Sequence, residues 1–170
     1  MTPPSASPNK RPRTGETIGW REHVGLPDLG IAEMAAKIDT GARTSALHAV
    51  DHEVFDRQGV RWVRFGAPTD RPGRFRTVES QIVDEREIKN TGGVPERRLV
   101  VRTTLLLGRH RWHIDVSLAD REKMEFDLIL GRTAIRRRGI LVDPGRSFLA
   151  GKPADQPARP APTEFKELSS

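Results

Sequence analysis

The chain has 170 residues and a mass of 19.0 kDa, which suits one domain or two small ones. Hydrophobic residues make up 35% of it and charged residues 31%, so we expect a modest core. No run of eighteen apolar residues is present, which argues against a membrane-spanning helix. No apolar segment follows the first charges, as it would in a secretory signal, and the absence of cysteine excludes disulfides, thiolate zinc sites and a cysteine nucleophile. These features predict a cytoplasmic protein.

The formal net charge of +6 is distributed along the chain. Residues 1–16 carry a net +2 and residues 152–170 carry none, which leaves +4 for the body between them. Acidic and basic residues are interspersed along this body. This pattern favours an ordinary solvated surface over a stripe that binds nucleic acid.

Proline-rich ends without periodicity predict disordered tails at residues 1–16 and 152–170, around one folded domain at 17–151. Inside the domain, turn residues separate short apolar or alternating segments, which are typical of β-strands. In chain order, the expected strands are 18–24, 34–39, 60–65, 99–107, 111–118, 127–130, 140–143 and 147–150. Gly108-Arg109 is a hairpin turn between two of them, and 132–138 forms one or two helical turns. Short strands with little helix predict a small all-β barrel or sandwich.

The segment Asp39-Thr40-Gly41-Ala42 has the most specific chemistry in the chain. It follows an apolar strand, so a carboxylate is delivered onto a glycine turn where small neighbours let another segment approach. Alone, the motif also fits a simple turn at the end of a strand. About ninety residues later, an apolar triplet runs into Gly131-Arg132 and the expected helical turn. The two motifs in this order, with a hairpin between them, are much more specific than either one.

This pair of motifs resembles the retropepsin-like aspartic proteases. Six segments over essentially the whole body are similar to one bacterial family within that group: 18–22, 37–48, 61–65, 83–86, 130–134 and 142–147. Members of this family are labelled ATP-dependent zinc proteases and are associated with ATP-grasp glutamate ligases that modify ribosomal proteins. The resemblance implies an all-β, retropepsin-like half-barrel (the acid protease fold) with one short helix.

The resemblance also implies an aspartic endopeptidase. Such enzymes use two carboxylates that share one proton, one activating water and the other polarising the scissile carbonyl. The chain has one Asp-Thr-Gly, and Asp143, in Asp-Pro-Gly, fits a turn better than a catalytic loop. We therefore expect Asp39 to pair with Asp39 of a second copy in a two-fold homodimer. By resemblance, Thr40 would bond across the dimer, and Gly41 and Ala42 would contact the substrate backbone.

Retropepsins close over the substrate with a hairpin flap, which the resemblance places at residues 83–98. Its tip would be 90–93, where Gly92 and Gly93 supply the freedom that a lid needs. These two glycines are therefore expected to lie against the substrate. An ordinary hairpin loop is the alternative for this segment, which is longer and more charged than a retropepsin flap.

Arg43 follows the Asp-Thr-Gly-Ala motif directly, where viral retropepsins have an acidic residue. A cation there could lower the pKa of the paired carboxylates or bind a substrate carboxylate. Together with the glutamate-ligase association, this favours an acidic or glutamate-tailed peptide as substrate. The alternative is a surface arginine paired with a nearby Asp or Glu.

The sequence gives no support for a zinc or nucleotide cofactor. The five histidines form no His-Glu-x-x-His motif, and no Gly-x-x-x-x-Gly-Lys-Ser/Thr loop is present, so any ATP dependence would come from a partner. His48 and His52 would meet only on a helix, and their region favours strand and turn. Thr44 and Ser45 lack the setting of a serine nucleophile and are expected to pack or hydrogen-bond the Asp39 loop.

Two other functions remain open from the sequence. One is a non-catalytic, dimeric peptide-binding module that regulates a glutamate ligase or a ribosomal protein through the same cleft. The other, weaker one is an RNA-contacting protein that uses Arg136-Arg137-Arg138 and the basic tail, although a solvated helix face explains that triplet equally simply.

Overall fold

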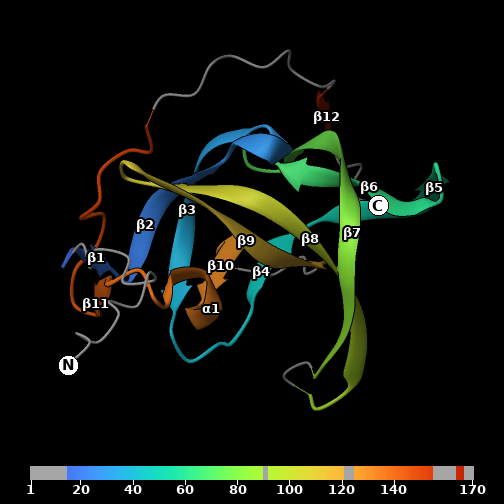
Figure 1. Ribbon diagram of the computed structural model, residues 1–170. Coiled ribbons are helices and arrows are strands. Elements are labelled where there is room, and N and C mark those ends of the chain that lie inside the picture. The colour runs from blue at the N-terminus through green and yellow to red at the C-terminus, as the bar shows by residue number, and fades with distance from the viewer. Residues whose placement is uncertain (1–14, 90–91, 121–124, 155–163, 167–170) are drawn as a thin grey trace, which may run out of the picture.

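The computed structural model describes residues 15–89, 92–120, 125–154 and 164–166 (Figure 1). The elements are almost all strands, with one helical turn and one 3₁₀ turn. In chain order they are β1 (Thr17–Gly19), β2 (Arg21–Leu26), η1 (Pro27–Leu29), β3 (Ile31–Asp39), β4 (Ser45–His48), β5 (Val50–Arg57), β6 (Val60–Pro68), β7 (Arg74–Lys89), β8 (Pro95–Leu107), β9 (His110–Ala119), β10 (Leu128–Gly131), α1 (Arg132–Ile135), β11 (Leu141–Asp143) and β12 (Glu164–Lys166). In these residues, no helix is both long and apolar enough to cross a membrane.

Six strands form a closed barrel in the order β2-β3-β10-β4-β9-β8, and β2 closes the ring by pairing with β8. The prediction of an all-β fold is therefore confirmed. Strand β9 illustrates why the sequence folds this way, because apolar residues alternate with polar ones and a strand turns successive side chains to opposite faces. Its buried residues join a single core that includes Ile38, Phe65, Leu105, Trp112, Ile114, Val116, Leu118 and Leu130.

Strand β10 lies between the two strands that flank the Asp39 loop. It pairs in parallel with β3, with Gly131 opposite Asp39, and antiparallel with β4, with Leu128 opposite Leu47. The chain that leaves β3 therefore cannot return beside it and must cross the end of β10 before it enters β4. This crossing places the loop at one end of the barrel, next to α1 (Figure 1).

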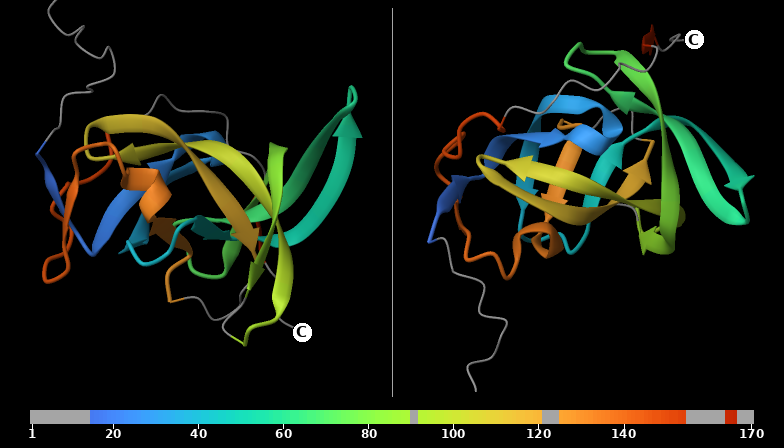
Figure 2. Two further views of the ribbon diagram at one scale, coloured as in Figure 1. Left: turned by 60° about the horizontal axis from the view of Figure 1, so that its bottom comes forward. Right: turned by 45° about the horizontal axis from the view of Figure 1, so that its top comes forward.

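Two hairpins project from the barrel. The β7–β8 hairpin extends toward the end of the molecule that holds the β3–β4 loop, and the β5–β6 hairpin extends sideways (Figures 1 and 2). The sequence did not predict β5 or most of β7, because charged residues occupy both faces of these strands and hide the period of two. Their exposed faces bear ion pairs instead of apolar contacts, as between Arg57 and Glu79 at 2.6 Å.

Three details correct the predicted elements. The first expected strand is divided at Trp20 into β1 and β2. Residues 147–150 form no strand, because the Phe148 N–H donates to the Arg21 carbonyl and the next two N–H groups donate to the side-chain carboxylate of Glu22. Helix α1 is limited to one turn, Arg132–Ile135, because Arg136 is already extended at φ −61° and ψ 151°.

The boundaries of the predicted tails also change. Glu16 belongs to the folded part, because its carbonyl accepts the N–H of Leu141 at 2.9 Å. Strand β12 pairs antiparallel with residues 74–76 of β7, so this piece of the expected carboxyl-terminal tail is a strand. The rest of both expected tails, except Gly15 and residues 152–154, lies outside the described residues.

Candidate active site

Asp39 is the last residue of β3, and the loop after it is closed around its carboxylate. The N–H groups of Gly41 and Ala42 donate to Asp39 Oδ1 at 3.1 and 3.2 Å, and Ala42 N–H also donates to the Asp39 carbonyl at 3.1 Å. Within the part of the chain that the structure describes, Oδ2 accepts no hydrogen bond. One oxygen is therefore fixed by the main chain, and the other is available to water or to a second carboxylate.

The start of α1 supports the outer part of this loop. Arg132 N–H donates to the Ala42 carbonyl at 2.8 Å, and its guanidinium donates to the Gly41 carbonyl at 3.2 Å. Thr133 Oγ1 donates to the carbonyl of Arg43 at 2.7 Å. The Asp39 loop is thus attached to a segment far away in sequence, which explains why the two motifs occur together.

Gly131 is the point where the loop passes closest to β10. A Cβ atom there would lie 2.6 Å from the main-chain carbon and oxygen of Thr44, so only glycine fits without displacing the loop. The Gly131 N–H donates to Ser45 Oγ at 3.0 Å, and the Ser45 carbonyl accepts from Ser117 Oγ at 3.0 Å. The Ser45 side chain therefore bonds β10 and not the Asp39 loop itself, and it fixes the point where the loop enters β4. Ser45 is fully buried.

The predicted flap corresponds to the β7–β8 hairpin, in which Ile82–Lys89 pairs with Pro95–Val101. Gly92 and Gly93 are exposed at its tip, and Gly93 has a φ of +75°, a conformation that favours glycine. Val94 beside them is 58% exposed, although it is apolar. Asn90 and Thr91, which belong to the predicted tip, lie outside the described residues. The hairpin points toward the end of the molecule that bears the Asp39 loop (Figure 1).

The surface around the Asp39 loop is basic. Arg43, Arg132 and Arg136 are exposed there, and Arg43 forms no ion pair with any residue that the structure describes. The alternative of an arginine paired with a neighbouring carboxylate is therefore not realised within those residues. Thr40 is also exposed at the tip of the loop. Asp143, by contrast, accepts the N–H of Gly145 at 2.9 Å, as expected for a turn residue.

The histidines lie at separate structural positions. His48 is buried with Nδ1 3.3 Å from the Ala119 carbonyl, and His110 pairs with Glu16 at 2.5 Å. His52 stacks on Phe65 at a ring distance of 6.5 Å. Among the described residues, no group of three or more His, Cys, Asp or Glu side chains is arranged to hold a metal ion.

Sequence reasoning missed the buried carboxylate of Glu22. It is fully buried and accepts three main-chain N–H groups, from Gly19 at 2.8 Å, Leu149 at 2.8 Å and Ala150 at 3.0 Å. These bonds attach the carboxyl-terminal end of the domain to β2. The available signal was its position in β2, two residues before the buried Val24 and therefore on the inward face of the strand.

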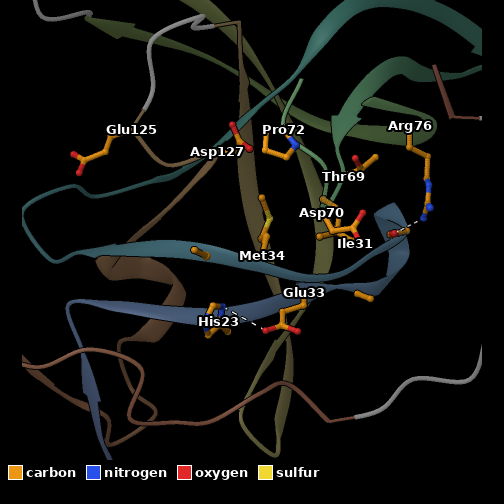
Figure 3. Close-up of a pocket in the computed structure, with 13 residues that line it drawn as sticks. His23, Ile31, Glu33, Met34, Thr69, Asp70, Pro72, Arg76, Glu125 and Asp127 are labelled. Carbon is orange, nitrogen blue, oxygen red and sulfur yellow. Dashed lines mark hydrogen bonds and ion pairs between the residues drawn. The ribbon is translucent and has the colours of Figure 1, made fainter. Parts of the chain in front are cut away.

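A cleft of about 630 Å³ lies away from the Asp39 loop, beside the first half of β3 (Figure 3). Its walls come from β3, from the turn between β6 and β7, and from the segment before β10. Protein atoms around the cleft remove part of the water from the Asp127 carboxyl and raise its pKa, and the nearby His48 ring offsets part of this rise.

Comparison with known proteins agrees with this geometry. The model of the RimB-like family, described as retropepsin-like aspartic endopeptidase RimB, matches residues 17–153. The chain belongs to this family. The expected membership of the retropepsin-like proteases is thereby confirmed, and the match spans the whole of residues 17–151.

Several curated relatives carry the name of another enzyme. The chain is 37% identical over 140 residues to a probable alpha-L-glutamate ligase of Shewanella halifaxensis, covering 81% of this chain and 30% of that protein. It is 39% identical over 137 residues to a probable alpha-L-glutamate ligase of Desulfotalea psychrophila, covering 79% and 29%. This RimB-like chain therefore spans less than a third of the length of these relatives.

A solved structure has the same fold. The protein Lpg0085 of Legionella pneumophila, of unknown function, is similar with a TM-score of 0.69 at 30% identity. The similarity covers 79% of this chain and 98% of that one. The fold is thus shared by a protein of nearly the size of this domain.

Proposed function

We propose that two copies of this RimB-like chain form an aspartic endopeptidase that hydrolyses peptide bonds with paired Asp39 carboxylates. The observation that carries the proposal is the Asp39 carboxylate, held through Oδ1 by two loop N–H groups while Oδ2 remains available. In the pair, one charged carboxylate takes a proton from water, and the other, protonated, donates to the scissile carbonyl. Two such close carboxylates share a single proton because both cannot be charged at low cost.

The second carboxylate has to come from another copy. The chain contains one Asp-Thr-Gly, and Asp143 is engaged in its own turn. Thr40 and Gly41 are exposed at the tip of the loop, where a two-fold axis would bring two such loops together. In this dimer Thr40 braces the paired loops, and Gly41, Ala42, Gly92 and Gly93 contact the substrate backbone.

We assign an acidic peptide as the substrate class. Arg43 has no carboxylate partner among the described residues, and Arg132 and Arg136 are exposed on the same side of the loop. Guanidinium groups bind carboxylates through paired hydrogen bonds, so a peptide rich in glutamate suits this surface. The names of the relatives support the same class, since a glutamate ligase would supply glutamate-tailed peptides. We place the protein in the cytoplasm with such a ligase as a functional partner.

The test begins with cleavage of a peptide set that includes glutamate-tailed members. We expect cleavage by the natural chain, loss of at least a hundredfold in Asp39→Asn, and no effect of a chelator. Arg43→Glu should reduce cleavage of acidic peptides and spare neutral ones. Cleavage lost to the chelator but retained by Asp39→Asn would overturn the assignment of Asp39.

A mixing experiment tests whether the site is shared between copies. Natural chain and Asp39→Asn are combined at rising proportions of the variant and allowed to exchange subunits. A shared site makes mixed dimers inactive, so activity per natural chain falls as the variant is added. Constant activity per natural chain would show that each copy works alone. A confirmed dimer that binds acidic peptides without cleaving any of them would favour the non-catalytic peptide-binding module.

A further inference from the structure

The cleft beside β3 lies at the opposite end of this strand from Asp39. Asp39 lies six positions after Glu33, which at about 3.3 Å per residue is about 20 Å along the strand. Figure 3 shows Met34, Thr69, Asp70, Pro72 and Asp127 around one space, contributed by three different segments. We call this space the β3 cleft.

One wall of the β3 cleft is a strand edge that lacks a neighbour. Strand β10 pairs with residues 36–39 of β3, and no described strand pairs with the same edge of residues 31–35. The Asp127 carbonyl accepts the N–H of His48 at 2.7 Å, so Asp127 still lies beside β4, and the ladder between β10 and β3 ends at Leu128 and Ala36. The sheet therefore has an open position in line with β10.

Main-chain groups of β3 point into this open position. Ile38 N–H donates to the Trp20 carbonyl at 2.7 Å, so Ile38 faces β2. Main-chain direction alternates along a strand, and Ala35 is three residues earlier, so its N–H and carbonyl face away from β2. The carbonyl lies where the parallel ladder with β10 begins, at Leu128, and the N–H faces the cleft. A register shift in the β2–β3 ladder follows closely, between Val24 and Leu26. An unpaired edge of this kind is a template for another strand.

The charge of the cleft favours a basic occupant. Asp70, Glu125 and Asp127 are exposed in it, and none of them pairs with a lysine or arginine among the described residues. Glu33 is paired with His23 at 3.4 Å. The Arg76 guanidinium donates to the Gly30 carbonyl. The cleft is thus locally acidic on a chain with a net charge of +6.

We propose that the β3 cleft binds an extended peptide segment bearing lysine or arginine side chains, which adds as a strand beside Ala35 in line with β10. Main-chain hydrogen bonds to the edge supply one part of the affinity, as in other cases of strand addition. The three unpaired carboxylates select basic side chains. The proposal is independent of catalysis, because its residues lie outside the Asp39 loop.

Binding is tested with fluorescein-labelled peptides and anisotropy on the natural chain. The probe alternates Lys and Val over seven residues, and its control alternates Thr and Val. We expect at least tenfold tighter binding of the basic probe, although the net charge of the chain would repel it. Equal binding of both peptides, or no binding of the basic probe, would overturn the proposal.

Two further measurements separate strand addition from simple charge attraction. Two further probes carry N-methyl groups on every second residue, one on the odd-numbered and the other on the even-numbered residues. Each keeps the charge of the peptide but loses the N–H donors along one of its two edges. One probe should lose binding and the other keep it, whereas equal binding of both probes would exclude an added strand. The double variant Asp70→Asn/Glu125→Gln should weaken binding about three- to tenfold.

The matched control variant is Asp56→Asn/Glu87→Gln, which makes the same charge change at exposed hairpin positions outside the cleft. It should leave binding of the basic probe unchanged. An equal loss in both double variants would assign the binding to the overall charge and overturn the site. Cleavage of acidic peptides is followed in parallel, so failure of this proposal is distinguishable from failure of the proposed peptidase.

Discussion

The two ends of β3 have opposite designs. At the Asp39 end, β10 lies alongside the strand, two N–H groups hold the carboxylate, and the start of α1 bonds to the loop. At the 31–35 end, one edge lacks a neighbour among the described residues, and Asp70, Glu125 and Asp127 have no lysine or arginine partner among them. A single strand thus joins a fully bonded end to an open one.

This contrast separates what stabilises the fold from what remains available for binding. Buried donors that have acceptors add to stability, and they hold a reactive group in one geometry. Like charges that lie close together without counter-charges lower the stability of the folded chain. This loss of stability is small only where solvent reaches the charges. Removing a bond at the closed end should therefore lower stability, and removing a charge at the open end should raise it.

The largest expected loss comes from Glu22, which lies opposite Ala36 where β3 passes from its open to its closed part. Glu22→Ala leaves the N–H groups of Gly19, Leu149 and Ala150 without their acceptor. At about 1–3 kcal/mol for each buried donor, the free energy of unfolding should fall by roughly 3 kcal/mol or more. Urea unfolding measures it.

Glu22→Gln is the control for that loss, because it keeps the shape and one carbonyl oxygen. It should lose less than half as much stability as Glu22→Ala. If Glu22→Ala stays within about 1 kcal/mol of the natural chain, the three bonds are not what holds residues 149–150 to β2.

Gly131→Ala should lower both stability and activity. Its Cβ would lie 2.6 Å from the main chain of Thr44, so either the loop or β10 has to move. Such overpacking costs about 1–3 kcal/mol, and a shift of about 1 Å in a catalytic group can cost a hundredfold in rate. Unfolding and peptide cleavage are measured together. Gly145→Ala, in an exposed turn, is the control, and a fully active Gly131→Ala would show that the close approach is unimportant for the Asp39 loop.

Ser45→Ala is expected to have a smaller effect at the same end. The buried Gly131 N–H loses its Oγ acceptor. The free energy of unfolding should fall by about 1 kcal/mol, near the lower end of the range for one unsatisfied neutral donor. Because the loop keeps its bonds to α1, cleavage should decline much less than in Gly131→Ala. Ser80→Ala, on β7, is the matched control in urea unfolding, and an equal change in both variants would remove the role assigned to Ser45.

The closed end was the part that the sequence predicted well. Asp39, Gly131 and Arg132 belong to local patterns that fix a strand, a turn and a helix start, so their contact follows from two short motifs. Ser45 was expected only to pack or hydrogen-bond the loop, and its partner Gly131 lies 86 residues away in the sequence. The Asp39 loop and the Gly131-Arg132 segment bond to each other, so the two motifs occur together about ninety residues apart and are recognisable as a pair.

The remaining features depend on contacts that no local pattern contains. Glu22 looks like a surface residue until residues 149–150 cover it. The projecting strand β5 has polar side chains on both faces, so its period of two is absent. The β3 cleft arises because β10 begins beside Ala36 and not earlier, a matter of register between segments far apart in the chain. Sequence periodicity specifies strands, and pairing decides where their edges remain open.

Asp127→Asn gives the smallest effect and the opposite sign. The surrounding atoms of the cleft raise the pKa of Asp127 above its unfolded value, so its charged form is favoured less in the folded chain. The penalty is present above the raised pKa and vanishes below the unfolded pKa of about 3.9. The variant should therefore be slightly more stable than the natural chain at pH 7, and the difference should shrink as the pH falls through the raised pKa. Thermal unfolding between pH 7 and pH 3.5 measures this, with Asp70→Asn as the exposed control. A variant that is less stable at pH 7 would mean that the folded chain stabilises the charged Asp127 carboxylate. The 31–35 end of β3 would then hold its carboxylates by favourable contacts, as the Asp39 end does.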